Sequence, residues 1–235
     1  MKIKTIVKYV LSIPKIIYLN YRVFPIEIAW RLPVFCHYHT KLESIFKGCF
    51  KIETDKITPG MIKLGCGMGS KGVFNGAYPS ESGGGYLDIH SGSEVIFKGN
   101  ATFAGGFSLR LDNGGKTIFG NDFACNSYCF IASNKKISFG DECTLGWHVK
   151  IRDVDGHDIF YLDDPTKMIN TDKEVAIGSH VWIASYVDIL KGTCIPDDVV
   201  VAYGSKLTGQ KFTERNCIIG GNPVRILKTN INWKI

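Results

Sequence analysis

The sequence predicts a parallel β-helix, in which short strands wind into a triangular coil, and three observations support this fold class. An aliphatic residue returns at every sixth position late in the chain, at Ile177, Ile183, Ile189, Ile195, Val201 and Leu207. Small or β-branched residues follow the first five of these by four positions, at Val181, Val187, Thr193, Val199 and Ser205. The same rhythm recurs upstream, between residues 97 and 151, with short interruptions.

A period of six does not fit the other regular structures. Six residues rotate an α-helix by about 600°, so successive aliphatic residues would lie on different faces. An ordinary strand needs alternation and gives no reason for strict sixes. In a triangular coil, each hexapeptide forms one short strand and one corner. Its aliphatic residue then points inward and stacks on its counterpart one turn away, about 4.8 Å along the axis.

The upstream part of the chain continues the coil with insertions. The period returns in three triplets: Phe97, Phe103 and Leu109; Phe119, Cys125 and Ile131; Phe139, Leu145 and Ile151. Residues 60–96 are predicted to form irregular first turns. The one long break, at about residues 155–174, is polar and rich in turn residues. A break of that length inside a regular coil is usually functional, so we expect an active-site loop there.

The ends of the chain lack the period of six. We expect a helical or irregular segment over residues 1–50, broken at Pro14 and Pro25, because proline disrupts a helix interior. The β-helix is predicted over residues 51–212 and includes the loop. A C-terminal tail is predicted over residues 213–235.

The basic charge of the protein is concentrated in its first 50 residues. Eight basic and two acidic residues lie there, which accounts for the whole net charge of +6. A nucleic-acid-binding protein would carry such charge on its folded body, so no nucleic acid partner is expected. Two uses remain open for residues 1–40. Their apolar side chains cap the end of the coil, or the segment contacts an anionic membrane surface; we favour the cap.

The composition also favours a cytoplasmic location. The sequence shows no secretory signal and no run of the roughly 20 apolar residues that a membrane span needs. Its eight cysteines have no framework spacing, which is typical of reduced thiols. We therefore expect a cytoplasmic protein, with the inner face of the membrane as an alternative site of action.

Two stretches resemble a known family. VWIASYVDILKGTCIPDDVVVAYGSKLTG, with the tail IIGGNPVRILK, is similar to the hexapeptide-repeat acyltransferases that use acetyl-coenzyme A. DVDGHDI resembles the catalytic-histidine loop of the bacterial branch that O-acetylates capsular and lipopolysaccharide sugars, and IPKIIYLNYRVFPIEIAWRLPVF resembles its leader. The resemblance implies a left-handed coil, a homotrimer with active sites between subunits, and a glycan acceptor.

The loop histidine is the best candidate for catalysis. Acyl transfer to a hydroxyl needs a base near neutrality, and the imidazole of His157 suits that task. A carboxylate would orient the ring; Asp155 is preferred and Asp153 is its rival. The resemblance places Trp182 and Asn126 against the acceptor.

The cofactor residues are carried over from the family by position. The resemblance implies coenzyme A contacts at Ala184, Ser185, Tyr203 and Thr208, and phosphate contacts at Arg225 and Lys228. A lysine common in the family is replaced by Gly209, and Lys206 or Lys211 would supply its charge. We also expect a backbone N–H, that of Ala184, to hold the oxyanion.

The sequence therefore predicts an acetyl-CoA-dependent acyltransferase that O-acetylates a sugar of a cell-surface polysaccharide or its precursor. Two alternatives stay open: N-acetylation of an amino sugar, and a non-catalytic or metal-dependent coil. The metal-dependent branch needs three histidines on adjacent coils, and only His148 and His180 could be two of them. No metal is therefore expected. The identity of the acceptor and the length of the acyl group are not evident from the sequence.

Overall fold

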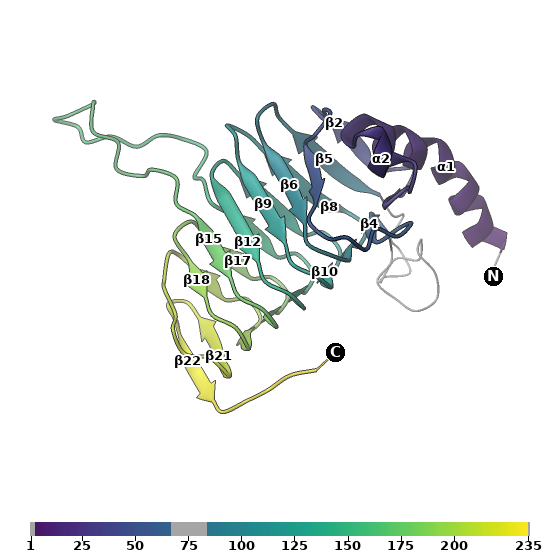
Figure 1. Cartoon of the computed structure of the whole chain (residues 1–235). Helices are drawn as coiled ribbons and strands as arrows, with labels where there is room; N and C mark the ends of the chain where they lie inside the picture. The colour runs from purple at the N-terminus through teal and green to yellow at the C-terminus, as the bar shows by residue number, and fades with distance from the viewer. Residues whose placement is uncertain (1–2, 67–83, 235) are drawn as a thin grey trace.

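The computed structural model describes residues 3–66 and 84–234 of the chain, and side chains from residue 6 onward. It confirms the left-handed parallel β-helix predicted from the sequence (Figure 1). Each strand from β1 to β17 pairs in parallel with the strand three places further along the chain. One turn therefore adds one strand to each of three sheets, which we call A, B and C. Residues 67–83 of the predicted irregular first turns lie outside the described residues.

The strands are two to six residues long. Sheet A contains β1 (Val34–Cys36), β4 (Ile62–Leu64), β7 (Ala101–Phe103), β10 (Phe123–Cys125), β13 (Thr144–Leu145), β16 (Trp182–Ile183), β19 (Val199–Val201), β21 (Cys217–Gly221) and β22 (Val224–Thr229). Sheet B contains β2 (Lys41–Glu43), β5 (Gly85–Ile89), β8 (Phe107–Leu111), β11 (Phe130–Ser133), β14 (Lys150–Arg152), β17 (Asp188–Ile189) and β20 (Lys206–Leu207). Sheet C contains β3 (Phe50–Ile52), β6 (Glu94–Phe97), β9 (Lys116–Phe119), β12 (Lys136–Phe139), β15 (Val175–Ile177) and β18 (Cys194–Ile195).

The predicted inward residues form columns along the coil. In sheet A, for example, Leu145 pairs with Ile183, which pairs with Val201, and all three are buried. In sheet C the column is aromatic: the rings of Phe97 and Phe119 stack at 5.5 Å, and those of Phe119 and Phe139 at 5.4 Å. Stacked rings bury large apolar areas, so this column stabilises the middle of the coil.

The corners of the coil need an unusual backbone conformation. His180, Tyr186 and Asp198 all have positive φ, near 54–60°, immediately before a buried corner residue. At the corner between sheets C and A, side-chain oxygens satisfy the backbone amides of the preceding turn. Asp141 N–H donates to Ser179 Oγ at 3.1 Å, and Ser179 N–H donates to Asp197 Oδ1 at 2.8 Å.

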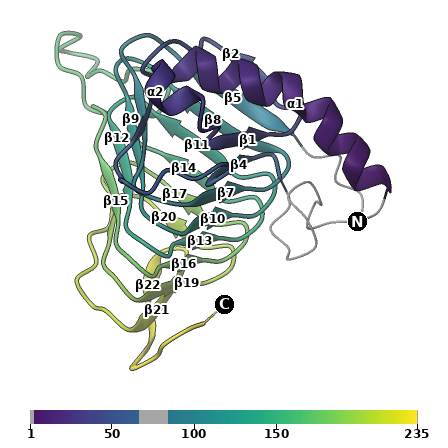
Figure 2. The same ribbon diagram turned by 45° about the vertical axis from the view of Figure 1, so that its right-hand side comes forward.

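Helix α1 (Ile3–Val23) covers the first end of the coil, and the short α2 (Ile26–Ala29) follows it (Figure 2). The predicted break at Pro25 is confirmed, but the predicted break at Pro14 is wrong, because α1 continues through it. Pro14 lies on the exposed side, where water can bond the carbonyl that loses its helical donor. Buried Ser12 and Ile16, on either side of Pro14, hold the helix on the coil.

The buried side of α1 bonds to the first strand of sheet A. Asn20 Nδ2 donates to Val34 O at 2.8 Å, and Val34 N–H donates to Asn20 Oδ1 at 3.1 Å. Lys15 Nζ donates to Tyr38 O and Thr40 O. These bonds satisfy backbone groups that an open coil end would leave to water or to another chain. Strands β1 and β2 lie inside the segment predicted as helical or irregular; no period of six marks them.

The other end of the coil finishes in a hairpin. In the predicted C-terminal tail, β21 pairs in parallel with β19 and antiparallel with β22. The chain then turns back along sheet A, where Trp233 Nε1 donates to His180 O at 2.9 Å and the two rings stack at 4.5 Å.

Candidate active site

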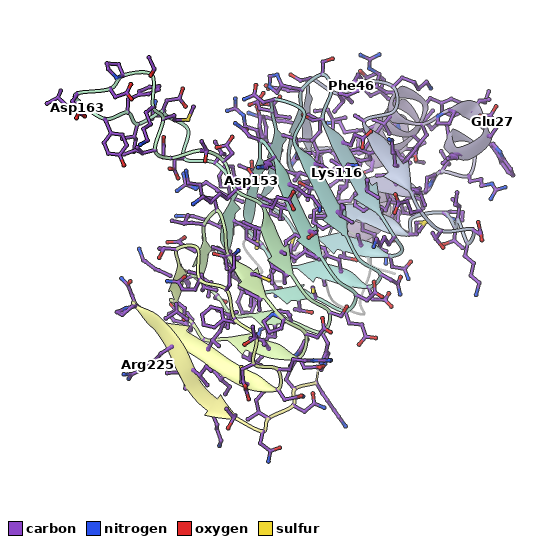
Figure 3. All side chains as sticks on the ribbon, turned by 60° about the vertical axis from the view of Figure 1, so that its left-hand side comes forward. Glu27, Phe46, Lys116, Asp153, Asp163 and Arg225 are labelled. Carbon is purple, nitrogen blue, oxygen red and sulfur yellow. The ribbon has the colours of Figure 1, made fainter. Side chains whose placement is uncertain are left out.

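The long loop leaves the coil at the corner between sheets B and C. It follows β14 and returns at β15, and it extends away from the coil (Figure 1). In Figure 3 Asp153 lies at its base, and Asp163 lies far out at its end. Most of its side chains are exposed, including Leu162, Phe160 and Tyr161. Within one chain the loop therefore reaches outward and does not fold back over the coil.

Asn170 and Lys191 hold the two arms of the loop together. The Asn170 amide donates to Asp155 Oδ2 at 3.0 Å and to His157 O at 2.7 Å, and it accepts from Ile159 N–H at 2.7 Å. Lys191, whose side chain is only 15% exposed, pairs with Asp155 at 2.6 Å and bonds Asn170 O. We call this group the loop clamp. Sequence reasoning missed Asn170 and Lys191 because neither follows the period or a motif.

The two candidate acids have different surroundings. Asp153 is fully buried and accepts from Ser133 Oγ at 2.6 Å, Asn134 N–H at 2.8 Å and Lys135 N–H at 3.0 Å. Both of its oxygens are therefore occupied in holding the preceding corner. Asp155 is more exposed, and hydrogen bonding from Lys191 holds the pKa of its carboxyl below the ordinary value. Asp155 therefore stays ionised at neutral pH.

His157 presents its side chain to solvent. Its backbone carbonyl is fixed by the clamp through Asn170, so the residue has a defined position although its ring is exposed. In the described part of the chain the ring makes no hydrogen bond to either acid. An exposed imidazole on an anchored backbone is available to a molecule that docks against the loop.

A cavity of about 870 Å³ lies beside the clamp. Its lining includes two acidic residues, Asp155 and Glu174, together with Thr208 and four lysines: Lys135, Lys173, Lys191 and Lys211. Such a cationic lining suits an anionic ligand such as a phosphate group. Thr208 and Lys211, two predicted cofactor residues, thus lie in one cavity with the base of the loop. Lys206, the alternative to Lys211, instead pairs with Asp188 at 3.5 Å.

The corner between sheets A and B holds the other predicted backbone contacts. The prediction for Ala184 as oxyanion donor is wrong, because its N–H donates to Val201 O at 2.9 Å inside the coil. Trp147 N–H is also satisfied, by Ser185 Oγ at 3.0 Å. The N–H groups of Ser185 and Tyr203, by contrast, have no protein acceptor in the described residues. For Ser185 the reason is that Tyr203 occupies the position, one turn later, where a serine hydroxyl would accept. These two amides are available to a ligand.

The predicted acceptor residues lie on the sheet A side. Trp182, in β16, is 40% exposed, and its ring centroid lies 6.0 Å from that of Trp233. Asn126 lies at the A–B corner, where its Nδ2 donates to Leu145 O at 3.1 Å. Arg225 and Lys228 are exposed on β22, at the C-terminal edge of sheet A; Figure 3 labels Arg225 there.

The predicted site residues therefore form two groups in one chain. His157, Asp155, Thr208 and Lys211 surround the B–C corner, whereas Trp182 and the A–B corner residues lie on or beside sheet A. Sheet A is the side of the triangle opposite the B–C corner. A single chain thus presents two half-sites on opposite sides.

The two histidines considered as metal ligands lie apart. His148 stacks between Tyr128 and Tyr186 at the A–B corner, at 5.1 and 4.9 Å. His180 lies at the C–A corner, where it pairs with Asp198 at 3.0 Å and stacks on Trp233. They do not form one ligand set, and no group of three or more ligating side chains occurs within the described residues.

Comparison with known proteins supports the same class. The chain is 32% identical over 149 residues to the polysialic acid O-acetyltransferase of Escherichia coli O1:K1, and the match covers 63% of this chain but only 44% of that relative. It is 32% identical over 136 residues to WbbJ of Escherichia coli K12, named for O-acetyl transfer in lipopolysaccharide biosynthesis, covering 54% of this chain and 68% of WbbJ. No protein-family model matches the sequence.

Among solved structures, the polySia-specific acetyltransferase NeuO is similar, with a TM-score of 0.48 and 26% identity over 64% of this chain and 67% of that one. The fold and the loop define a β-helix with a cavity at the corner from which the loop extends. The chain belongs to the hexapeptide-repeat acyltransferase family, in the branch of capsular and lipopolysaccharide O-acetyltransferases.

Proposed function

We propose that the protein is an acetyl-CoA-dependent acyltransferase that O-acetylates a sugar of a cell-surface polysaccharide or its precursor. The observation that carries this proposal is the clamped loop, which fixes the backbone of His157 two residues after Asp155, and Asp155 lines a cavity together with four lysines. The relatives support it, since their names specify O-acetyl transfer to polysialic acid and in lipopolysaccharide biosynthesis.

His157 is the proposed general base. Its imidazole takes the proton of the sugar hydroxyl while the oxygen attacks the thioester carbonyl, and the C–S bond then breaks. The imidazolium returns the proton to the leaving thiolate, so the histidine is restored. Asp155, which stays ionised, is the acid that stabilises and orients the imidazolium. We assign this role to Asp155 rather than to Asp153, because the Asp153 carboxylate already accepts three hydrogen bonds.

The coenzyme A arm would use the free amides. Pantetheine carries amide carbonyls, and the N–H groups of Ser185 and Tyr203 are donors without a protein acceptor in the described residues. Lys211, Arg225 and Lys228 are the proposed cationic partners of the phosphates. The A–B corner would therefore bind the arm through the backbone of Ser185 and Tyr203 rather than through their side chains.

The two half-sites imply that more than one copy forms the active site. His157 extends from the B–C corner, and Trp182, Asn126 and Ser185 lie on the opposite side of the same chain. In a ring of three copies, the loop of one chain would reach sheet A of the next, which completes the site. We therefore propose a homotrimer.

The eight free cysteines fit a reducing cytoplasm.

The test is an acceptor screen. The purified protein is mixed with acetyl-CoA and a panel of saccharides and amino sugars, and both thiol release and product mass are measured. We expect thiol release that depends on a saccharide, with one acetyl ester on the product. An acetyl amide would assign the protein to N-acetylation, and the absence of transfer to every saccharide would contradict the proposal.

A further inference from the structure

Helix α1 has two apolar faces, and only one of them packs on the coil. The inner face consists of buried residues: Ser12, Ile16, Leu19, Asn20 and Val23. The outer face consists of side chains that are 43–58% exposed: Ile6, Val7, Val10, Leu11, Ile13, Ile17, Tyr18 and Tyr21. At 100° per residue these eight positions form one continuous arc of about 160°, opposite the inner face. The cap on the coil therefore accounts for only half of the apolar helix.

Basic residues line one edge between these two faces. Lys8, Lys15 and Arg22 recur every seven residues, which places them along one flank of α1. Lys15 bonds Tyr38 O and Thr40 O, and Arg22 Nε bonds Ile45 O at 3.1 Å. The carbonyl partners of Lys15 and Arg22 carry no net charge, so these bonds do not neutralise either cation. No acidic residue occurs in the whole helix.

Two more large apolar side chains are exposed in the residues that follow α1. Ile26 and Trp30 follow in and after α2 with 63% and 62% exposure, and Arg31 lies 5.6 Å over the Trp30 ring. Tyrosine and tryptophan rings prefer the level of lipid headgroups, where one end is apolar and the other is hydrated. Figures 1 and 2 show that the first turns of α1 extend past the end of the coil, so a flat surface can approach them.

We propose that the outer face of α1 docks on an anionic membrane surface, with the helix axis in the plane of the headgroups. The basic flank of α1 favours an anionic lipid surface over a second copy of this chain. A lipid surface rich in acidic headgroups complements the basic flank, whereas two copies of α1 packed together would bring the same cations close to one another. No helix of the described residues is long and apolar enough to cross a membrane, which leaves a position on the surface. The inner face caps the coil at the same time, so the two predicted uses of this segment belong to opposite faces.

Vesicle flotation tests the proposal with the full chain and without reference to activity. Phosphatidylcholine vesicles are compared with vesicles that also contain phosphatidylserine. We expect binding to the anionic vesicles alone, weakened when salt is raised because the Debye length falls from about 30 Å at 0.01 M to about 10 Å at 0.1 M. The outer-face variant Val7→Gln/Val10→Gln/Ile17→Gln should lower the bound fraction at least tenfold.

The matched control replaces three exposed apolar residues of the loop, as Leu162→Gln/Met168→Gln/Ile169→Gln, and should bind vesicles like the unchanged protein. Circular dichroism and light scattering on each variant check the fold and the size. Equal binding of both vesicle types, no binding, or an outer-face variant that binds normally would overturn the proposal. A smaller assembly in the outer-face variant would assign the face to a second copy and would overturn it as well.

Discussion

Replacing each acid at the base of the loop with asparagine separates their roles. Asp153→Asn replaces one of the two accepting oxygens with an NH₂ group, so it removes either the bonds from Ser133 Oγ and Lys135 N–H or the bond from Asn134 N–H. Asp155→Asn removes a partly exposed ion pair with Lys191. We expect the first change to lower stability and the second to lower turnover.

The structure sets the size of these effects. A bond to a charged acceptor contributes about 1.5–3 kcal/mol. Asp153→Asn removes one or two of the three bonds and also the negative charge that strengthens the rest, so we expect a net loss of about 3 kcal/mol. For a chain of this length that loss lowers the unfolding midpoint by about 6–12 °C. The solvent-screened pair of Asp155 contributes less than about 1 kcal/mol.

Thermal unfolding followed by circular dichroism measures the first effect, and thiol release well below both midpoints measures the second. The reasoning fails if Asp153→Asn unfolds like the unchanged protein. It also fails if Asp153→Asn stays folded while its turnover collapses, because Asp153 would then be the acid that orients His157.

Three further outcomes follow from the site and the cap. His157→Ala should keep the fold and lower thiol release by about 10²–10⁴-fold, the usual contribution of a positioned base, and near-normal turnover would remove His157 from the mechanism. Arg225→Ala with Lys228→Ala should raise the KM for acetyl-CoA far more than the KM for the acceptor; equal increases would contradict the phosphate contacts. Burial, then the neighbouring His39, lowers the pKa of His37 to about 4. The folded chain therefore binds fewer protons than the unfolded chain between about pH 6.5 and 4, so stability should fall by a few kcal/mol as the pH drops through this range. His37→Gln should flatten this dependence in urea titrations; an unchanged slope would contradict it.

The coil could be predicted because its core is periodic. An apolar residue at every sixth position, such as Ile183 or Ile189, fits a triangular coil and no other regular structure. The register of the sheets confirms the coil, because Ile183 pairs with Leu145 and Ile189 pairs with Ile151. The path of α1 could not be predicted from local rules. Pro14 normally breaks a helix, but buried contacts on both sides of it outweigh the lost bond. Strands β1 and β2 were missed because they precede the first regular turn.

The residue types of the candidate site could be proposed from the sequence, whereas the contacts between these residues could not. His157 and Asp155 were identified from a motif in the one long loop, and the structure anchors both of them. The loop clamp joins Asp155 to Asn170 and Lys191, which lie 15 and 36 positions later in the sequence, and only the fold brings these residues together. Whether a backbone N–H at the A–B corner has an acceptor depends on the side chain one turn later. Ser185 accepts from Trp147 N–H, whereas Tyr203 does not accept from Ser185 N–H. Such pairs across turns carry no signal in the local sequence.

Mixing two inactive variants tests most directly whether an acyl-transfer site forms between copies of the chain. One variant carries His157→Ala, and the other carries Asn126→Ala with Trp182→Ala. Each is assayed alone for acetyl-CoA thiol release with a saccharide acceptor, then both are unfolded, mixed and refolded together. We predict that the mixture recovers activity well above the sum of the separate variants, because a loop with His157 meets an intact sheet A in some interfaces. A mixture that is no more active than that sum, at equal yields of assembled protein, would contradict a site shared between copies.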